Sequence, residues 1–332
     1  MTRASLVFGA LLTVLVPLSL LAGRVWIAPW ADGPANAALI LGELRLPRAM
    51  LAITIGAGLG AAGAAMQGYL RNPLADPGLF GIAPMAALGA VASFWLGAVI
   101  PPAFAAWALP VMALAGAGLG MALLALIAGR TSSDAAGGAG GGIALFTLAG
   151  LMLASLAGAL TALAITLAPS PFALSEIVLW LNGALTDRSW REVAIAAPLV
   201  AAGIAVLALA ARNLDALTLG EDAARSMGVE PRRLLALLVV GIGLTVGAGV
   251  AVAGIIGFVG LVVPHLVRPL TNRLPSSLIV PSALAGACLV LAADSIVRIL
   301  PMVTELRLGI ALSLIGAPFF GWLLLRMRRG QL

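Results

Sequence analysis

The sequence predicts an all-α integral membrane protein: one domain, residues 1–332, with about ten transmembrane helices and an internal inverted repeat. Three observations predict this class. The 332 residues are 62% hydrophobic with a mean hydropathy of +1.12, whereas soluble domains are about 45–50% apolar. Apolar runs of bilayer length recur along the chain. A glycine-rich motif also occurs twice.

The expected spans follow the apolar runs in order. The first, 5–28, is long and has no clear small-residue cleavage site after it, so a retained helix is favoured over a signal peptide. The run 234–267 is too long for one crossing, and Gly254, Gly257 and Gly260 are expected to divide it into two. The other runs are 46–70, 79–100, 103–129, 141–168, 192–211, 278–299 and 308–325.

Arginine sets the expected orientation, because all 19 basic residues are arginines. An even number of spans places both termini on one side of the membrane. With the termini in the cytoplasm, 12 arginines lie inside and seven outside, which agrees with the positive-inside rule. The basic residues are scattered over connections, so nucleic-acid binding is a poor explanation of the charge.

Charged residues concentrate in one stretch, the polar segment 212–233. It cannot lie in hydrocarbon, because each charge at the bilayer centre costs about 2.5–3.5 kcal/mol. Two short helices joined at Gly220 are expected. The second starts with Glu221 and Asp222, continues to Arg225 and stops at Gly228, the charge order that the helix dipole favours. The alternative is an ordinary solvated loop.

The repeated motif consists of 54–73 and 245–264, which share Thr-x-Gly-Ala-Gly, Ala-Gly and Pro at equal spacing. In the expected topology the two copies cross the membrane in opposite directions. Inverted repeats with interrupted helices are typical of transporters. Close helix packing at small residues is the simpler explanation of these glycines.

Several chemistries are excluded by residue counts. Cys288 is the only cysteine and His265 the only histidine, so a disulfide within the chain, a His/Cys metal cluster and a Cys/His dyad are all excluded. The sequence contains no lysine and no GxxxxGK[ST] phosphate loop. No catalytic residue, metal site or cofactor is therefore expected in this chain.

Several motifs resemble the permease subunits of ABC importers. Asp222-Ala-Ala-Arg-Ser-Met-Gly228 is similar to their EAAxxxG coupling motif. Other motifs resemble the iron-chelate, haem and cobalamin permeases, the FecCD or BtuC-like family. These motifs are Arg45-Leu-Pro-Arg48, Gln67 with Arg71-Asn-Pro-Leu-Ala-Asp-Pro77, Trp180-Leu-Asn-Gly183, Leu217-Thr-Leu-Gly220, Ala253 to His265 with Arg268, Ala293 to Arg298, Glu305 to Gly309 and Gly316 to Phe320.

The resemblance implies a BtuC-like homodimer in the bacterial inner membrane. Two cytoplasmic subunits would bind ATP and Mg²⁺ and dock on the polar segment, and a periplasmic binding protein would deliver the chelate. The coupling residues it implies are Leu217, Gly220, Glu221, Asp222, Ala223, Ala224, Arg225 and Gly228. The pathway and helix-break residues are Gln67, Asn72, Pro73, Gly254, Gly257 and Pro264.

The resemblance also implies that Arg45, Arg48 and Arg298 dock the binding protein. They could instead only set the topology, and Arg298 could pair with Asp294 one helical turn earlier. An ion-coupled secondary transporter using Asp294 is the alternative function, and an intramembrane enzyme is disfavoured because acidic clusters are missing. Ferric siderophore is the expected substrate, with haem and cobalamin next.

Overall fold

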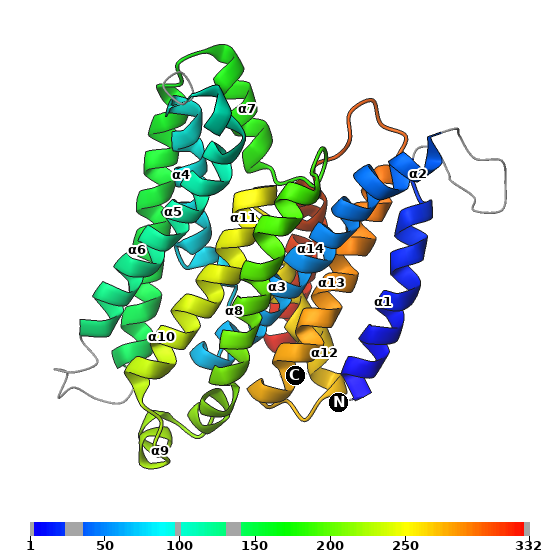
Figure 1. Cartoon of the computed structure of the whole chain (residues 1–332). Helices are drawn as coiled ribbons and strands as arrows, with labels where there is room; N and C mark the ends of the chain where they lie inside the picture. Colours follow the sequence, from blue (N-terminus) through cyan, green and yellow to red (C-terminus); the bar gives the residue numbers. More distant parts are fainter. Residues whose placement is uncertain (1–2, 24–35, 97–100, 131–140, 329–332) are drawn as a thin grey trace.

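The computed structural model describes residues 3–23, 36–96, 101–130 and 141–328, which form a helical bundle without strands (Figure 1). π-Helical segments at Ile40–Arg45 and Gly243–Gly247 and 3₁₀ turns at Pro77–Leu79 and Arg268–Leu270 supplement the α-helices. The α-helices are α1 (Arg3–Leu21), α2 (Ala37–Leu39), α3 (Leu46–Leu70), α4 (Ile82–Leu96), α5 (Pro102–Arg130), α6 (Gly141–Thr166), α7 (Pro171–Leu181), α8 (Trp190–Leu217), α9 (Glu221–Ser226), α10 (Pro231–Ile242), α11 (Ala248–Ala253), α12 (Val259–Val267), α13 (Pro275–Ile299) and α14 (Leu308–Arg328).

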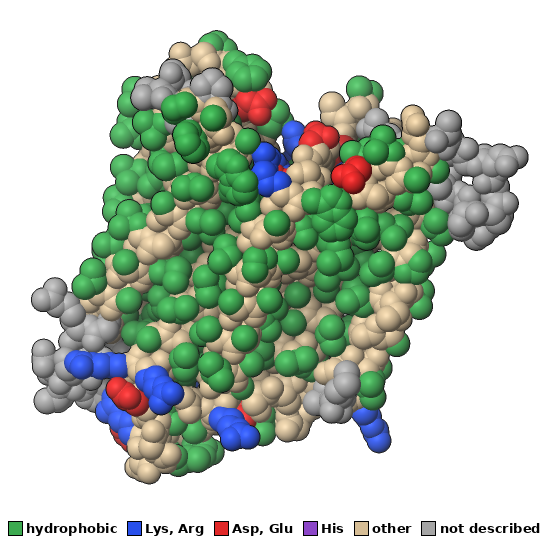
Figure 2. Space-filling model, viewed as in Figure 1, with side chains coloured by type: hydrophobic (Ala, Val, Ile, Leu, Met, Phe, Trp, Pro, Cys, Tyr) green, Lys and Arg blue, Asp and Glu red, His purple; other side chains and the backbone are tan. Residues whose placement is uncertain are grey.

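The bundle has the surface of a membrane protein. Eight of the described helices are long and apolar enough to cross a bilayer, and α4 and α12 are shorter apolar helices. These ten match the ten expected spans, although parts of the runs 5–28 and 79–100 lie outside the described residues. Figure 2 shows hydrophobic side chains covering the middle of one face, with charged groups at its two ends.

Both ends of the described chain lie at the same end of the bundle. Figure 1 shows α1 starting, and α14 ending, at the end that carries α9. We call this the α9 end and the opposite one the far end. An even number of crossings gives this arrangement, as the sequence predicts.

The core is built around α3, which packs against both α8 and α13 (Figure 1). Small residues permit this. A side chain on Gly56 would collide with the Gly286 backbone of α13, and one on Gly60 would collide with Ser282. Such close backbone approach replaces the hydrophobic driving force that is missing between helices in lipid.

One helix in the fold has no counterpart in the predicted spans. α7 begins after Ser170, whose hydroxyl accepts a hydrogen bond from the Ala173 N–H at 3.1 Å, and Pro171 occupies its first position. Both are ordinary helix-start signals. With 11 residues, α7 is too short to cross a bilayer, so the hydropathy of whole spans does not reveal it.

Candidate translocation and coupling site

The polar segment 212–233 begins as the end of α8, which continues to Leu217. Thr218, Leu219 and Gly220 then follow in tight turns, each N–H bonding the carbonyl three residues before it. The expected short helix before Gly220 is therefore wrong. No glycine or proline lies between Arg212 and Leu217, so the long helix has no reason to stop earlier.

The expected second helix of the polar segment is confirmed as α9. Gly220 precedes it with φ +107°, a conformation that costs glycine little. Glu221 and Asp222 occupy the first turn and Arg225 the last, so their charges complement the helix dipole.

Glycine also ends α9. Gly228 has φ +88°, and the N–H of Val229 reaches back to the carbonyl of Ala224 at 3.0 Å. This is the hydrogen-bond pattern of a left-handed helix cap. The segment is therefore a compact turn–helix–turn unit rather than an unstructured loop.

One face of α9 is buried and the other is exposed. Ala224 is 2% exposed and Leu217 is 5% exposed, and together with Tyr69 of α3 they line a cavity of about 50 Å³. The opposite face exposes Asp222, Arg225 and, beside them, Met227. This exposed face is a protruding surface at the α9 end that a partner can reach.

An irregular break joins the seventh crossing, which ends in α11, to the eighth crossing, α12. α11 ends at Ala253, residues 254–258 run without helical bonds, and α12 begins at Val259. Gly254 has φ +73°, and a side chain there would collide with the carbonyl of Trp180. The breaks expected at Gly254 and Gly257 are confirmed, whereas Gly260 lies inside α12.

Irregular backbone within a membrane must find hydrogen-bond partners inside the protein. The Ala253 carbonyl accepts from the N–H of Ala184 at 2.8 Å, in the connection between α7 and α8. Gly183 in the same connection has φ +62°, and its carbonyl accepts from the Gly309 N–H at 3.1 Å. The Trp180–Gly183 motif thus supports the start of the break.

Asp76 lies beside the other end of the break. Its carboxylate accepts the Gly78 N–H at 2.7 Å and lines the same cavity as Phe258, which immediately precedes α12. The N-terminus of α12 favours a negative charge. One 9% exposed carboxylate therefore lies where the connection between α3 and α4 meets the break.

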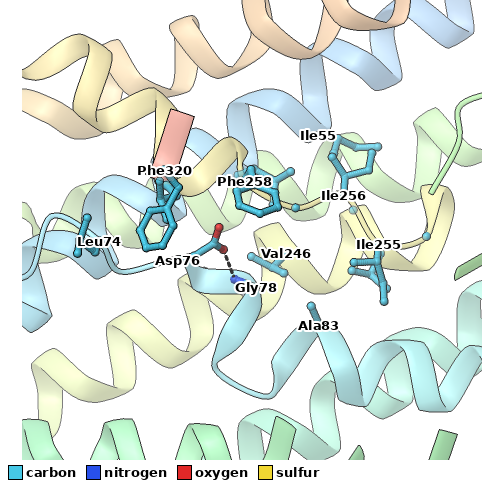
Figure 3. A pocket seen from close by; sticks show the side chains of 16 residues that line it. Ile55, Leu74, Asp76, Gly78, Ala83, Val246, Ile255, Ile256, Phe258 and Phe320 are labelled. Carbon is cyan, nitrogen blue, oxygen red and sulfur yellow. Dashed lines mark hydrogen bonds between the residues drawn. The ribbon is translucent and has the colours of Figure 1, made fainter. Parts of the chain in front are cut away.

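A cavity of about 350 Å³ follows this break and continues past Asp76. Figure 3 shows the rings of Phe258 and Phe320 beside Asp76 and the isoleucines 255 and 256 toward the other end. The lining is otherwise apolar. It is contributed by α3, the connection between α3 and α4, α4, the π-helical segment Gly243–Gly247, α11, the break, α12 and α14. A mostly apolar cavity with one carboxylate in its lining suits a bulky apolar solute.

Gln67 and Pro264 are coupled through the backbone of α12. Pro264 lies inside α12 and does not break it, contrary to the expectation. Proline has no N–H for the carbonyl four residues before it, and that carbonyl belongs to Gly260. The buried Gln67 amide of α3 donates to the Gly260 and Leu261 carbonyls at 3.3 and 3.2 Å. Gln67 therefore supplies the missing donor.

Asn72 and Pro73 end α3 and do not line the large cavity. The Asn72 side chain accepts the Leu74 N–H at 3.0 Å, and its own N–H bonds the Gln67 carbonyl at 3.2 Å. This local turn chemistry is usual for asparagine. Pro73 follows in the same turn, after α3 has ended at Leu70.

Two of the arginines expected to dock a partner cap α1. Arg45 donates to the carbonyls of Leu20 and Leu21 at 2.7 and 2.9 Å. Arg298 donates to the Ser19 carbonyl at 3.1 Å. The last carbonyls of a helix have no partners within it, and cations there are favourable. The two guanidinium groups thus fix the far end of α1.

Arg48 lies in a buried ion network at the far end. Its Nε and Nη2 donate to Asp294 Oδ1 at 2.9 and 2.8 Å, and its Nη groups also bond Glu305. Arg298 lies 3.2 Å from the other Asp294 oxygen, as expected for residues four apart. Docking through Arg45, Arg48 or Arg298 would require these side chains to leave their present partners.

Two charged groups in connections outside the spanning helices have shifted pKa values. Burial of the Glu305 carboxyl opposes its ionisation, but the hydrogen bonds and the charge of Arg48 outweigh it and hold the pKa of Glu305 below its usual range. Burial lowers the pKa of Arg188, in the connection between α7 and α8, and Asp187 and Glu192 oppose that shift.

His265 lies among aromatic groups near the α9 end. Its ring centroid is 6.0 Å from that of Phe319 in α14, and its Nδ1 is buried without a hydrogen-bond partner in the described structure. Within residues 3–23, 36–96, 101–130 and 141–328, no group of three or more His, Cys, Asp or Glu side chains could hold a metal ion.

Comparison with known proteins agrees with this arrangement of helices. A model of the FecCD transport family matches residues 11–326. The chain belongs to this family. It is accordingly a multi-pass membrane protein with the BtuC-like fold that its motifs imply.

Relatives of this FecCD chain are permease proteins of import systems for different cargoes. The hemin permease HmuU of Yersinia pestis is 36% identical, covering 86% of this chain and 83% of its own. The vitamin B12 permease BtuC of Klebsiella pneumoniae is 36% identical over 97% and 93%. The Fe(3+) dicitrate permease FecD of Escherichia coli is 35% identical over 92% and 91%.

A solved structure agrees with the fold over nearly all of the FecCD chain. It is a metal-chelate type ABC transporter in an inward-facing conformation, 28% identical, with a TM-score of 0.85 and coverage of 97% of this chain and 98% of that one.

Sequence reasoning did not connect Arg48 with Asp294 and Glu305, which lie 246 and 257 residues away, and no local pattern links such distant positions.

Proposed function

We propose that this chain is the translocation subunit of an ATP-driven importer that moves an iron chelate from the periplasm to the cytoplasm. Ferric siderophore is the first candidate, with haem and cobalamin next. The observation that carries the proposal is the apolar cavity beside the break at residues 254–258, which Asp76 also lines. The bundle that contains this cavity carries α9 at one end. The names of the hemin, vitamin B12 and Fe(3+) dicitrate relatives support this class of cargo.

The proposed assembly is a homodimer in the bacterial inner membrane, with both termini and α9 in the cytoplasm. Two ATP-binding subunits dock on α9, and these subunits bind the ATP and Mg²⁺. A periplasmic binding protein docks at the far end. The chain itself does not hydrolyse ATP, in keeping with a sequence that has no phosphate loop.

Coupling follows from how α9 is seated. Its buried Ala224 packs with Leu217 at the end of α8, close to Leu234 at the start of α10. Since α10 continues through Gly243–Gly247 into α11, a push on α9 is transmitted toward the break at Gly254. Movement of the ATP-binding subunits thereby alters the cavity without any chemistry in this chain.

An ion-coupled secondary transporter is the weaker candidate. It needs a carboxylate that can bind and release a cation within the membrane. Asp294, the residue expected for that role, is already neutralised by Arg48 and Arg298. This arrangement supports a structural role for Asp294.

Co-purification with the neighbouring ATP-binding subunit tests the proposal. We expect the wild type to retain that subunit and the Asp222→Arg/Arg225→Glu variant to lose it, since both changes lie on the exposed face of α9. Arg3→Glu/Glu43→Arg is the matched control, because it also exchanges two exposed charges but lies outside the polar segment. Failure of the wild type to bind any ATP-binding subunit would restore the secondary transporter.

The same preparation identifies the cargo. Proteoliposomes containing the assembled importer and its binding protein are given labelled ferric siderophore, haem or cobalamin with ATP inside. Uptake of one of them, abolished by removing ATP, assigns the substrate. Uptake driven by an ion gradient without ATP would contradict the proposal.

A further inference from the structure

Three arginines line a pocket at the α9 end, next to the polar segment 212–233. The pocket, of about 220 Å³, lies where α3 ends, beside Thr218 and the connection between α12 and α13. Arg71, Arg268 and Arg273 line it together with Gln67, and no acidic residue does. We call this the arginine pocket.

Arg268 is held in place with one donor unused. Its Nη2 donates to Gln67 Oε1 at 3.0 Å, and the Gln67 amide nitrogen is in turn fixed by the carbonyls of α12. The Arg268 Nε is buried and has no hydrogen-bond partner in the described structure. Buried donors normally have acceptors, so this position lacks one.

The other two arginines adopt backbone conformations that are rare for their type. Arg71 has φ +49° and Arg273 has φ +67°, a region that side chains other than glycine and asparagine seldom occupy. Such strain is typical of ligand clamps. Among the ion pairs of the described residues, none involves Arg71, Arg268 or Arg273.

Acidic groups nearby are already engaged. Asp215 at the end of α8 accepts the Ser276 N–H at 2.8 Å, in the same turn of α13 that borders the pocket. Three arginines therefore line the pocket, and no carboxylate is among its lining residues.

Exposed apolar side chains lie next to two of the pocket's arginines in the sequence. Leu266, Leu270 and Leu274 are 50%, 49% and 40% exposed, and they alternate along the chain with Arg268 and Arg273. A lipid presents this combination of chemistry, with an anionic headgroup above acyl chains. A soluble anion would use the arginines but not the leucines.

We propose that the arginine pocket binds the phosphate of an anionic glycerophospholipid. The planar guanidinium groups of Arg71, Arg268 and Arg273 suit the oxygens of a phosphate, which accept paired hydrogen bonds. The exposed leucines contact the acyl chains. The inference requires that the chain spans a membrane, and it does not depend on the transported cargo or on the ATP-binding partner.

Native mass spectrometry of the purified chain, with phosphatidylglycerol or phosphatidylcholine added to the detergent, tests the proposal. We expect the wild type to retain phosphatidylglycerol about tenfold more tightly than phosphatidylcholine, since each arginine near an anionic lipid adds attraction. Arg71→Gln/Arg268→Gln/Arg273→Gln should lose that preference. Arg3→Gln/Arg212→Gln/Arg328→Gln removes the same charge from exposed positions at this end and should keep it.

A second arm separates a lipid from a free anion. Inorganic phosphate is added to lipid-free protein, and the melting temperature is compared with that in chloride. If phosphate stabilises the wild type but phosphatidylglycerol is not retained, the ligand is a soluble anion and the lipid proposal is overturned. Equal retention of phosphatidylglycerol by the wild type and the pocket variant overturns it as well.

A smaller change guards against misfolding of the triple variant. Arg71→Gln/Arg273→Gln alters only the two exposed arginines and leaves the Gln67–Arg268 hydrogen bond in place. This variant should still weaken phosphatidylglycerol retention several-fold while eluting as a monodisperse species. Unchanged retention in this folded variant would also contradict the proposal.

Discussion

Arg48 and Asp294 join α3 to α13 through a guanidinium–carboxylate pair 2.8 Å apart, in which the carboxylate is completely buried. Arg298 approaches the same carboxylate from within α13. The guanidinium groups of Arg48 and Arg298 thus share the buried carboxylate of Asp294, and Arg48 also pairs with the carboxylate of Glu305. The network joins segments that are far apart in the sequence.

Asp294→Asn should destabilise the subunit strongly. Removing one member of a buried ion pair leaves the others uncompensated, which costs about 3–5 kcal/mol. The melting temperature in detergent measures this. Glu230→Gln, at an exposed position, is the control and should change stability by less than about 0.5 kcal/mol. Equal melting of both variants would show that the network contributes little.

The contact between Glu305 and Arg48 should depend on pH in a defined direction. The pKa of Glu305 is held below its usual value of about 4.3, so the contact stabilises the fold fully above that value and loses its effect as the pH falls through the lowered pKa. The protection factors of the amides at residues 302–306, which correct for the pH dependence of intrinsic exchange, should therefore be unchanged from pH 7 to about 5 and fall only in stronger acid. In Arg48→Gln, protection should be low throughout, and strong protection there would refute this account.

Gly56→Ala should disrupt the packing of α3 on α13. The added carbon would lie 2.7 Å from the carbonyl carbon of Gly286, and overpacking of this kind costs about 1–3 kcal/mol or more. Gly158→Ala in α6 is the matched control, because nothing lies within 4 Å of its added carbon. It should be neutral or stabilise slightly, since alanine favours helix. Yield and melting temperature in detergent report both.

Asp76→Ala should loosen the interrupted crossing. The Gly78 N–H would lose its acceptor, at a cost of about 1–3 kcal/mol, and Phe258 would lose the carboxylate beside it. We expect a lower melting temperature and faster hydrogen exchange at residues 255–259. Asn72→Ala, which removes only an exposed turn contact, should leave that exchange unchanged. The same rate in both variants would contradict the role assigned to Asp76.

Sequence patterns predicted the elements whose signals are local. Long apolar runs gave the spanning helices, and the glycine and charge order around Gly220 and Gly228 gave α9. The interruption at Gly254 followed from the apolar run 234–267, which is too long for one crossing and contains this glycine. Pro264 shows the limit of such reasoning: it breaks no helix, because Gln67, 193 residues away, supplies the missing donor. The same limit applies to Arg48 and Glu305, whose pairing depends on the packed fold.

The capping of α1 has a consequence for the order of synthesis. Arg45 follows the carbonyls it caps by only 24 and 25 residues, so it is available almost as soon as α1 is made. Arg298 follows Ser19 by 279 residues, which takes about 15–55 s at about 5–20 residues per second. The first helix is therefore held by its neighbour while most of the subunit is still untranslated. Its final position is fixed only when the ninth crossing arrives.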